Sequence, residues 1–362
     1  MSNRQVQTTR PASGGLPPEA RDALARLLRD RGGSVAAGPA RDALAAAGWV
    51  VPGSGQLDPG AALLFGCDVG GTKTQSVIAD LSGRVMAEIK EPTAPDGGHA
   101  VIDQIATHRR MLAGRAGIDA ARIGAAAIGM PAAVHPQTAA LSRIPNIRGI
   151  EALDLPRLLS DRLNLPVVVE NDVNLAAQGE HWLGHGAATM VFIALGTGIG
   201  MGIMVHDRLL RGARGAAGEI SALPIGGDAF DPATHATGAL ESVVSSKALL
   251  AAYERRGGAA GRTLREAFAA PHDAAFAETL DDLARLLALA ILSVSAVIDP
   301  EMIVLGGSIG SRPELLAALR GHLLRCMAPA PDCRISALGN RAGVIGAVWS
   351  ARLALARQYQ PS

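Results

Sequence analysis

The sequence predicts an α/β protein with two similar lobes, on the basis of two observations. Apolar stretches typical of buried strands alternate with amphipathic helical stretches along most of the chain, which is the pattern of helices covering mixed sheets. A unit of apolar strand, glycine-rich turn and apolar strand also occurs twice, at residues 65–80 and 192–207. Because such a duplication indicates a repeated structural unit, we expect two like-folded lobes that face each other across a cleft.

The length of the chain suits two domains and an extension, since 362 residues exceed what a single core usually holds. We expect a helical extension with a linker at residues 1–60, a small lobe at residues 61–173 plus 343–362, and a large lobe at residues 174–342. Within the extension, two helical stretches precede a Pro/Gly/Ser-rich segment at residues 52–60, whose composition is typical of a linker.

Charge and hydropathy exclude several classes of protein. The formal net charge of +1 produces no overall field that would draw the chain to nucleic acid or to an anionic membrane. No apolar run reaches the roughly 18 residues of a membrane span, and the first residues lack the apolar core of a signal peptide, so we expect a cytoplasmic protein. The three cysteines form neither a disulfide framework nor a zinc-like spacing.

The first hairpin contains the residues of a phosphate-binding turn. Gly70 and Gly71 lack a Cβ atom, so the turn can adopt positive φ and bring backbone N–H groups close to an anion. Thr72 adds a hydroxyl and Lys73 a positive charge, while Asp68 is a natural oxygen ligand for a Mg²⁺ ion bound to phosphates. A bulge or a plain hairpin also uses glycine, which is the alternative for this segment taken alone.

The second hairpin repeats this turn with Gly196, Thr197 and Gly198. Two such turns can hold one nucleotide between them, which is the arrangement of the actin-like ATPases, with their ribonuclease H-like fold, and of sugar kinases. A third close approach of the backbone is expected at Gly306 and Gly307, which end another apolar strand.

Asp172 is the best catalytic candidate. It directly follows an apolar strand and precedes a helix, which is where α/β folds place reactive side chains. In phosphoryl transfer to an alcohol, a positioned Asp accepts the hydroxyl proton. The alternative is that Asn171 and Asp172 cap the helix, since both residue types are preferred N-caps, and both roles can hold together.

Three further residues have the chemistry to bind sugar hydroxyls. Glu219 lies in a Gly/Ala-rich loop after the second hairpin, Glu241 follows the next loop, and Asn146 carries its amide in a loop after Pro145. The alternatives are solvated charges for the two glutamates and a turn-stabilising role for Asn146.

The assembled motifs resemble the ROK family of sugar kinases and sugar-responsive repressors over residues 63–357. The matching segments, in the order of the family, are CDVGGTKT, GMPAAV, IPN, VVVENDVNLAA, LGTGIGMG, GAAGEI, GALES, PEMIVLGGSIG and LGNRAGVIGA. The resemblance implies an ATP- and Mg²⁺-dependent sugar kinase with an actin-like fold, which phosphorylates the primary hydroxyl of a hexose, as a glucokinase does, or of a related sugar.

The resemblance also implies roles for individual residues, with Asp172 as the catalytic base and Asp68 serving Mg²⁺ through phosphates and water. It assigns the phosphates to Gly70, Gly71, Thr72, Lys73, Gly196, Thr197 and Gly198, adenosine to Gly306 and Gly307, and the sugar hydroxyls to Asn146, Asn171, Asp172, Glu219 and Glu241.

One loop departs from the family pattern. Typical members continue from Gly-Glu-Ile into Gly-His and a cysteine-rich zinc motif, whereas this chain reads GEISALPIGGDAFDPATHATGALES, with Ala222 in place of the His that binds zinc and helps to hold the sugar. We therefore expect no structural zinc and a loop held by its own packing and by Pro224 and Pro232. The departure also predicts an unusual hexose, an amino sugar or a cyclitol as substrate, or binding without turnover.

The extension is the basis of an alternative function. Repressors of the family carry a winged helix-turn-helix ahead of the kinase-like body, and residues 38–55 look like the tail of a degenerate one. A sugar-responsive transcriptional regulator is therefore the alternative. The arginines of the extension are interleaved with acidic residues, as on a solvated helix face, so DNA binding is not favoured. The resemblance also implies a homodimer, while the choice of sugar, and of ATP over polyphosphate as donor, stays open.

Overall fold

The structure is a computed structural model that describes residues 15–142, 147–151, 153–270 and 272–360. The chain divides into two compact units, unit 1 with Met1–Leu183 and Gly343–Ser362, and unit 2 with Gly184–Ala342. The division falls after helix α5 (Asp172–Leu183) and not at residue 174, where the sequence placed it. α5 belongs with unit 1 because its backbone at Leu175 lies directly against Gly346 of helix α12 (Ala342–Arg357).

Both units contain a five-stranded mixed sheet of the same topology. The strand order is β3-β2-β1-β4-β7 in unit 1 and β10-β9-β8-β11-β12 in unit 2. In each sheet the glycine-turn hairpin pairs antiparallel and two further strands join it in parallel. The duplicated hairpin is therefore part of a duplicated sheet. The strands are β1 (Leu63–Val69), β2 (Lys73–Asp80), β3 (Val85–Pro92), β4 (Ile123–Met130), β7 (Val167–Asn171), β8 (Met190–Leu195), β9 (Ile199–Val205), β10 (Arg208–Leu209), β11 (Met302–Gly306) and β12 (Asp332–Ile335), with a separate pair β5 (Ala133–Val134) and β6 (Leu141–Ser142).

Helices alternate with these strands, as expected for an α/β protein. Unit 1 contains α1 (Pro18–Arg29), α2 (Pro39–Ala46), α3 (Gly98–Arg115) and α4 (Leu155–Leu163) besides α5 and α12. Unit 2 contains α6 (Glu241–Val244), α7 (Ser246–Arg255), α8 (Leu264–Phe268), α9 (Ala274–Ile298), α10 (Gly307–Gly310) and α11 (Pro313–Cys326). Within the described ranges, none of the helices has the length and apolar character required to cross a membrane.

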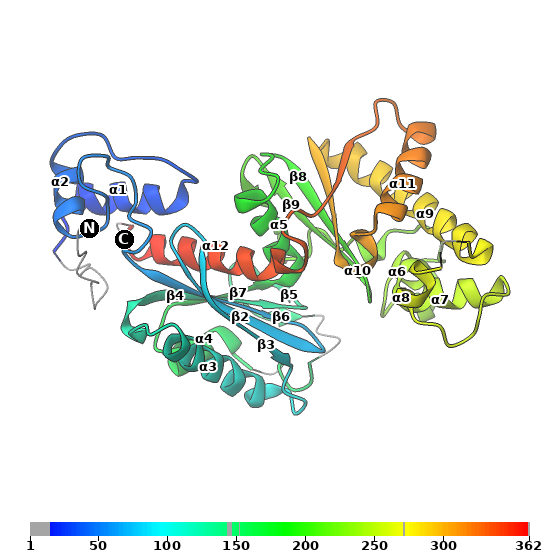
Figure 1. The fold of residues 1–362 in the computed structure, drawn as a ribbon, viewed down its shortest axis with the longest axis horizontal. Helices are drawn as coiled ribbons and strands as arrows, with labels where there is room; N and C mark the ends of the chain where they lie inside the picture. The colour runs from blue at the N-terminus through cyan, green and yellow to red at the C-terminus, as the bar shows by residue number, and fades with distance from the viewer. Residues whose placement is uncertain (1–14, 143–146, 152, 271, 361–362) are drawn as a thin grey trace. The chain divides into compact units, whose positions relative to one another are not determined.

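The sheet of unit 1 is covered on both faces (Figure 1). α3 and α4 pack on one face, where Ile105 and Leu159 join Phe65 of β1 in an apolar core. α12 packs on the other face, where Gly66 leaves room for Val344. Because side chains alternate between the two faces of a strand, Asp68 lies on the same face as Gly66 and points toward α12.

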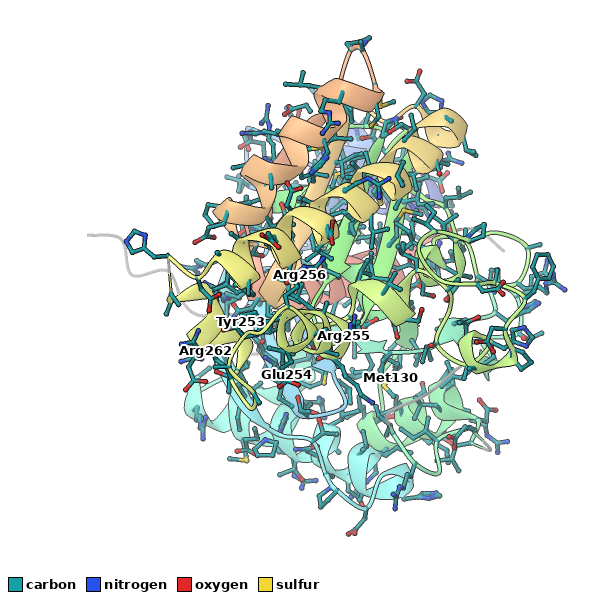
Figure 2. The ribbon with its side chains drawn as sticks, turned by 90° about the vertical axis from the view of Figure 1, so that its right-hand side faces the viewer. Met130, Tyr253, Glu254, Arg255, Arg256 and Arg262 are labelled. Atoms are coloured by element: carbon teal, nitrogen blue, oxygen red, sulfur yellow. The ribbon has the colours of Figure 1, made fainter. Side chains whose placement is uncertain are left out.

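The core of unit 2 includes the buried Tyr253, which is labelled in Figure 2 together with Arg262. The tyrosine hydroxyl both donates and accepts a hydrogen bond. Tyr253 Oη of α7 donates to Asp273 Oδ2 at 2.5 Å, and Arg262 Nη1 lies 2.9 Å from both oxygens. Asp273 also caps α9, because its Oδ1 accepts from the N–H of Phe276. This polar cluster ties α7 to the start of α9.

The segment at residues 52–60 belongs to a hydrogen-bonded hairpin within unit 1, with most of its side chains exposed, and does not separate two units as the predicted linker would. Val50 bridges Leu57, and the N–H of Val51 donates to the Gln56 carbonyl at 2.8 Å. Trp49, which is fully buried, meets the ring of Tyr359 edge-on, with the ring centroids 5.3 Å apart. Proline, glycine and serine form a tight turn here. The same residue types are common in flexible segments, so composition alone does not distinguish the two.

We expect Gly346→Ala to destabilise the protein by at least about 2 kcal/mol, because an overpacked core forces backbone shifts. A Cβ at position 346 would overlap the carbonyl oxygen of Leu175. The matched control is Gly114→Ala in α3, where an added Cβ meets nothing within 4 Å, and where alanine should stabilise by about 0.5–1 kcal/mol. Urea unfolding measures both, and equal stability of the two variants would contradict the packing described for α12.

Candidate functional site

The carboxyl ends of three strands of unit 1 meet at one edge of the sheet. The register pairs Asp68 of β1 with Gly129 of β4, and Gly129 with Glu170 of β7. Asp172 follows directly as the first residue of α5. The fold therefore brings Asp68 and Asp172 to the same edge, which is where open α/β sheets bind their ligands.

The start of α5 is capped mainly by Asn171. Its Oδ1 accepts from the N–H groups of Val173 and Asn174, both at 2.9 Å, and its Nδ2 donates to the Ala132 carbonyl at 3.1 Å. Asp172 Oδ1 also accepts from the N–H of Val173, at 2.9 Å. The capping alternative therefore holds for Asn171, and a bond from the helix backbone orients the partly exposed carboxylate of Asp172.

The carboxylate of Asp68 occupies space that two glycines leave open. A Cβ at Gly343, in the first turn of α12, would lie 2.8 Å from Oδ2, and one at Gly129 would lie 3.3 Å from Oδ1. Loss of hydration raises the pKa of Asp68 to about 6, although the positive charges of Lys73 and Lys90 act to lower it. Mg²⁺ needs only one or two carboxylates when phosphates complete its ligand shell. The site therefore fits a magnesium ion held chiefly by phosphate oxygens.

The first glycine turn is closed by a short backbone bond and supported by the residue that follows β3. The N–H of Gly70 donates to the Lys73 carbonyl at 2.9 Å, and Thr93 Oγ1 donates to the Gly70 carbonyl at 2.6 Å. Gly70 and Gly71 are free to adopt positive φ, and neither residue does. Glycine serves close approach here instead, since a Cβ at position 70 would lie 3.2 Å from the Lys73 carbonyl oxygen.

The second glycine turn is built in the same way within unit 2. The N–H of Gly196 donates to the Gly198 carbonyl, and the N–H of Ser246 donates to the Gly196 carbonyl, both at 2.9 Å. A Cβ at Gly196 would lie 3.1 Å from Ser308 Oγ, so this turn adjoins the turn after β11. The turn thus exposes Thr197 fully and Gly196 and Gly198 in part, while the N–H of Gly196 is bonded within the turn.

Gly306 and Gly307 lie close to other parts of the protein, while their predicted place beside adenosine stays a prediction. A Cβ at Gly306 would overlap the ring of Phe192, and one at Gly307 would overlap the Leu195 carbonyl. Gly307 also has φ of 82°, which disfavours any side chain. The start of α10 is thereby pressed onto the end of β8, next to the second glycine turn.

The two candidate sugar-binding glutamates lie near the second glycine turn. Glu241 Oε2 accepts from the N–H of Ile199 at 2.9 Å, and a Cβ at Gly198 would overlap the same oxygen. Burial raises the pKa of Glu241, the Ile199 N–H bond lowers it, and the negative charge of Glu219 adds to the rise. The structure therefore brings Glu219, Glu241 and the second turn together, and Glu241 contacts that turn directly, which the sequence did not predict.

The loop that replaces the zinc motif is held by a threonine hydroxyl. Thr234 Oγ1 lies 2.7 Å from the Asp228 carbonyl and 2.9 Å from the Asp231 carbonyl, and the Thr234 carbonyl accepts from the N–H of Gly238 at 2.7 Å. Pro232, one of the two predicted supports, begins the 3₁₀ turn Pro232–Thr234. In the part of the chain that the structure describes, no group of three or more His, Cys, Asp or Glu side chains is arranged to hold a metal ion.

Several residues that complete the site had no signal in the sequence. Thr93 donates to the first glycine turn, Ser246 donates to the second, and the charge of Lys90 acts to lower the pKa of Asp68, which burial raises. Each of the three lies in another part of the chain, and the residues around it do not indicate this role. Glu170 differs, since it ends an apolar strand beside Asn171 and Asp172, in a cluster more polar than one cap requires. It is 3% exposed, accepts from both Asn171 N–H and Asn174 Nδ2 at 3.0 Å, and so holds the cap of α5. Asn146 lies outside the described residues, so its predicted sugar contact stays a prediction.

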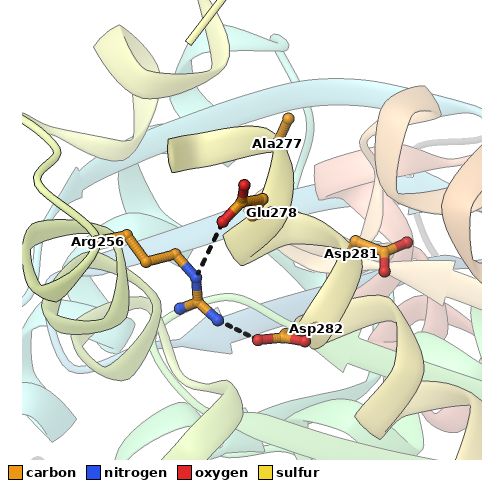
Figure 3. Close-up of a pocket in the computed structure, with 5 residues that line it drawn as sticks. All are labelled: Arg256, Ala277, Glu278, Asp281 and Asp282. Carbon is orange, nitrogen blue, oxygen red and sulfur yellow. Dashed lines mark hydrogen bonds and ion pairs between the residues drawn. The ribbon is translucent and has the colours of Figure 1, made fainter. Parts of the chain in front are cut away.

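A surface depression of unit 2 includes none of the predicted site residues. It is lined by Arg256, Ala277, Glu278, Asp281 and Asp282 (Figure 3). The guanidinium of Arg256 is paired with Asp282, and its Nε lies 3.9 Å from Glu278 Oε2. Because its cation is already neutralised by these carboxylates, we assign no ligand to this depression.

Comparisons with known proteins match most of this chain. The profile of the ROK family matches residues 64–354. A glucokinase of Halalkalibacterium halodurans is 33% identical over 78% of this chain and 93% of its own. A ROK family glucokinase from Streptomyces griseus, solved with glucose and AMPPNP, has a TM-score of 0.69 at 27% identity, covering 80% of this chain and 99% of that one. A ROK family transcriptional regulator, a homologue of the E. coli MLC protein, has a TM-score of 0.71 at 20% identity, covering 92% of this chain and 89% of that one.

These findings confirm the predicted actin-like fold and the predicted class of sugar kinase. The regulator, at its low identity, supports the fold alone. The family profile begins at residue 64, after the N-terminal extension. Since the profile covers most of the chain and the identity reaches 33%, this chain belongs to the ROK family.

Proposed function

We propose that this chain is an ATP-dependent kinase that phosphorylates the primary hydroxyl of a hexose or a related sugar. The observation that carries the proposal is the shared design of the two units: each has a glycine turn in the same hairpin of the same sheet. Unit 1 adds Asp172 at the edge where Asp68 ends β1. A homodimer and a cytoplasmic location stay predictions.

Asp172 acts as the general base in this proposal. It accepts the proton of the sugar hydroxyl as that oxygen bonds to the γ-phosphorus, while the bond from the γ-phosphorus to the bridging oxygen breaks and ADP leaves. The N–H of Val173 orients the carboxylate through Oδ1. Lys73, with the backbone N–H groups of the two glycine turns, stabilises the charge on the phosphates. Mg²⁺, when bound through Asp68, would neutralise part of the same charge.

Glu219 and Glu241 are the proposed acceptors for sugar hydroxyls, with the second amide hydrogen of Asn171 as a donor. Carboxylates suit this task because each oxygen accepts hydrogen bonds from hydroxyl groups. Without the His that typical members have at position 222, the sugar loses one contact, so the substrate class includes hexoses, amino sugars and cyclitols. A coupled ADP-release screen of purified protein over these three classes tests the proposal, with polyphosphate in a parallel series as alternative donor.

A sugar-responsive regulator is the second candidate, because the chain has an altered zinc loop and an N-terminal extension ahead of the kinase-like body. The fold likeness to the ROK regulator covers 92% of this chain. A match of that extent has to include part of the N-terminal extension. No ADP release across the whole panel, together with salt-sensitive binding to DNA upstream of the coding gene, would favour the regulator and contradict the kinase. Release of ADP with any one sugar would support the kinase.

We expect Asp172→Asn to lower kcat by about 10²–10⁴, since the amide cannot take up the hydroxyl proton. The KM for the sugar should stay within a few-fold of the original value, because the amide oxygen can still accept from the N–H of Val173. Steady-state kinetics with the sugar found in the screen measures both. Asp161→Asn on α4, which changes an exposed carboxylate, is the control, and near-normal turnover of Asp172→Asn would remove the role proposed here.

We expect Asp68→Asn to stabilise the ligand-free protein at pH 7 while lowering its activity. The pKa of Asp68 rises from 3.8 to about 6 on folding, so the folded state disfavours the ionised form. The resulting loss in the free energy of unfolding is absent below pH 4, grows between pH 4 and 6 and is fully present above pH 6, where it amounts to about 3 kcal/mol. Urea unfolding of both proteins at pH 7 and pH 4 measures the difference. A variant that gains no stability at pH 7 relative to pH 4 would contradict the assignment.

A further inference from the structure

A buried arginine lies where two helices of unit 1 meet. Arg352 of α12 is 6% exposed, and its guanidinium lies 5.7 Å from the ring centroid of Trp182 and 5.2 Å from that of Trp349. The two rings also contact each other, with centroids 4.9 Å apart. Ser350 Oγ of α12 donates to Gln178 Oε1 of α5 at 2.8 Å, inside the same buried region. α5 and α12 are therefore joined around the guanidinium.

Arg352 bonds to the end of a helix in the N-terminal extension. Its Nη2 donates to the carbonyls of Leu27 at 3.0 Å and Asp30 at 2.8 Å, at the C-terminal end of α1. The last carbonyls of a helix lack partners within the helix and carry the negative end of its dipole, so they can compensate a cation that has lost its water. Burial lowers the pKa of Arg352 to about 10, against the effect of Asp30, so the guanidinium stays charged at neutral pH.

The extension also holds the end of α5. Arg31 Nη1 donates to the His181 carbonyl at 2.7 Å, in the last turn of α5. Trp49 of the extension packs on Tyr359, which follows α12, and is a further contact. The extension thus holds α5 at its C-terminal end and α12 along its C-terminal half.

The other ends of these two helices carry site residues. α5 begins at Asp172, and the first turn of α12 contains Gly343, which lies against the carboxylate of Asp68. A helix of 12 residues is a rod about 18 Å long, so a tilt at one end displaces the other. Because the ROK profile begins at residue 64, this support from α1 is additional to the core that the family profile describes.

We propose that the N-terminal extension braces the phosphoryl-transfer site, with Arg352 and Arg31 as positioning residues that fix α5 and α12 and so set the places of Asp172 and Asp68. The catalytic consequence rests on the proposed kinase function. The bracing of the two helices does not, and it is measurable without turnover.

The test compares the full chain with Arg31→Ala, Arg352→Met and Arg352→Lys. Arg31→Ala changes an exposed side chain, so it decides the question even where a variant at the buried Arg352 does not fold. Arg352→Lys keeps the charge without the planar fork. Arg357→Met, at an exposed position in the last turn of α12, is the matched control. Two readouts are taken: hydrogen exchange of residues 172–176 at the start of α5, and kcat and KM for the sugar and ATP.

We expect exchange at residues 172–176 to rise about tenfold in Arg31→Ala and Arg352→Met, because freeing one end of α5 loosens the other. We also expect kcat to fall about tenfold with both KM values within twofold, since misalignment of the base slows the chemical step more than it weakens binding. Arg352→Lys should recover part of kcat, and Arg357→Met should match the original chain in both readouts.

Unchanged exchange at residues 172–176 in Arg31→Ala would overturn the brace, whether or not α1 itself becomes more mobile. Increased exchange with kcat unchanged would overturn the positioning role. If no sugar supports turnover in the original chain, the kinase proposal fails, and the exchange measurement still decides whether the extension fixes α5.

Discussion

Contact between main-chain atoms of α12 and α5 is the constraint on which the site of unit 1 depends. Gly346 leaves room for the Leu175 carbonyl and for nothing larger. Main-chain atoms have no rotamers with which to adjust, so this contact fixes the position of α5 relative to α12. The start of α5 sets the place of Asp172, and the start of α12 places Gly343 against Asp68. The two acidic residues proposed for catalysis are thus positioned by one pair of helices.

The electrostatics of Asp68 are consistent with the proposed role of this carboxylate in binding a cation. Asp68 is held where it is poorly hydrated, and its two lysine neighbours only partly offset the loss. A carboxylate kept in this state costs stability until a cation arrives, which is a common trade between stability and function at binding sites. Glu241 is in a related state in unit 2, with its pKa raised by burial and a nearby carboxylate, and with one backbone bond as compensation.

The sequence predicted the features that repeat locally and missed those that join distant segments. The paired hairpins and Asp172 were found because their residues follow one another in the chain. Thr93 and Arg352 were missed because their partners lie in other elements, and nothing in a helix or strand pattern reports them. Residues 52–60 were predicted as a linker because composition describes turn chemistry and does not show whether a turn closes a hydrogen-bonded hairpin. Gly70 does not adopt positive φ for a related reason, since a glycine can also serve where two backbone segments lie too close for a side chain.

The N-terminal extension bears on the choice between enzyme and regulator through thermodynamic coupling. If docking of α1 fixes α5 and α12, then a ligand that orders the start of either helix must stabilise docking of α1 by the same free energy, because linkage between two equilibria is reciprocal. Undocking of α1 would break both hydrogen bonds from Arg352 to the carbonyls at the C-terminal end of that helix. A DNA-binding domain that is released by sugar would need the opposite coupling, in which the bound sugar weakens the docking of α1 on α5 and α12. The Arg352 contacts therefore favour an extension that serves the site.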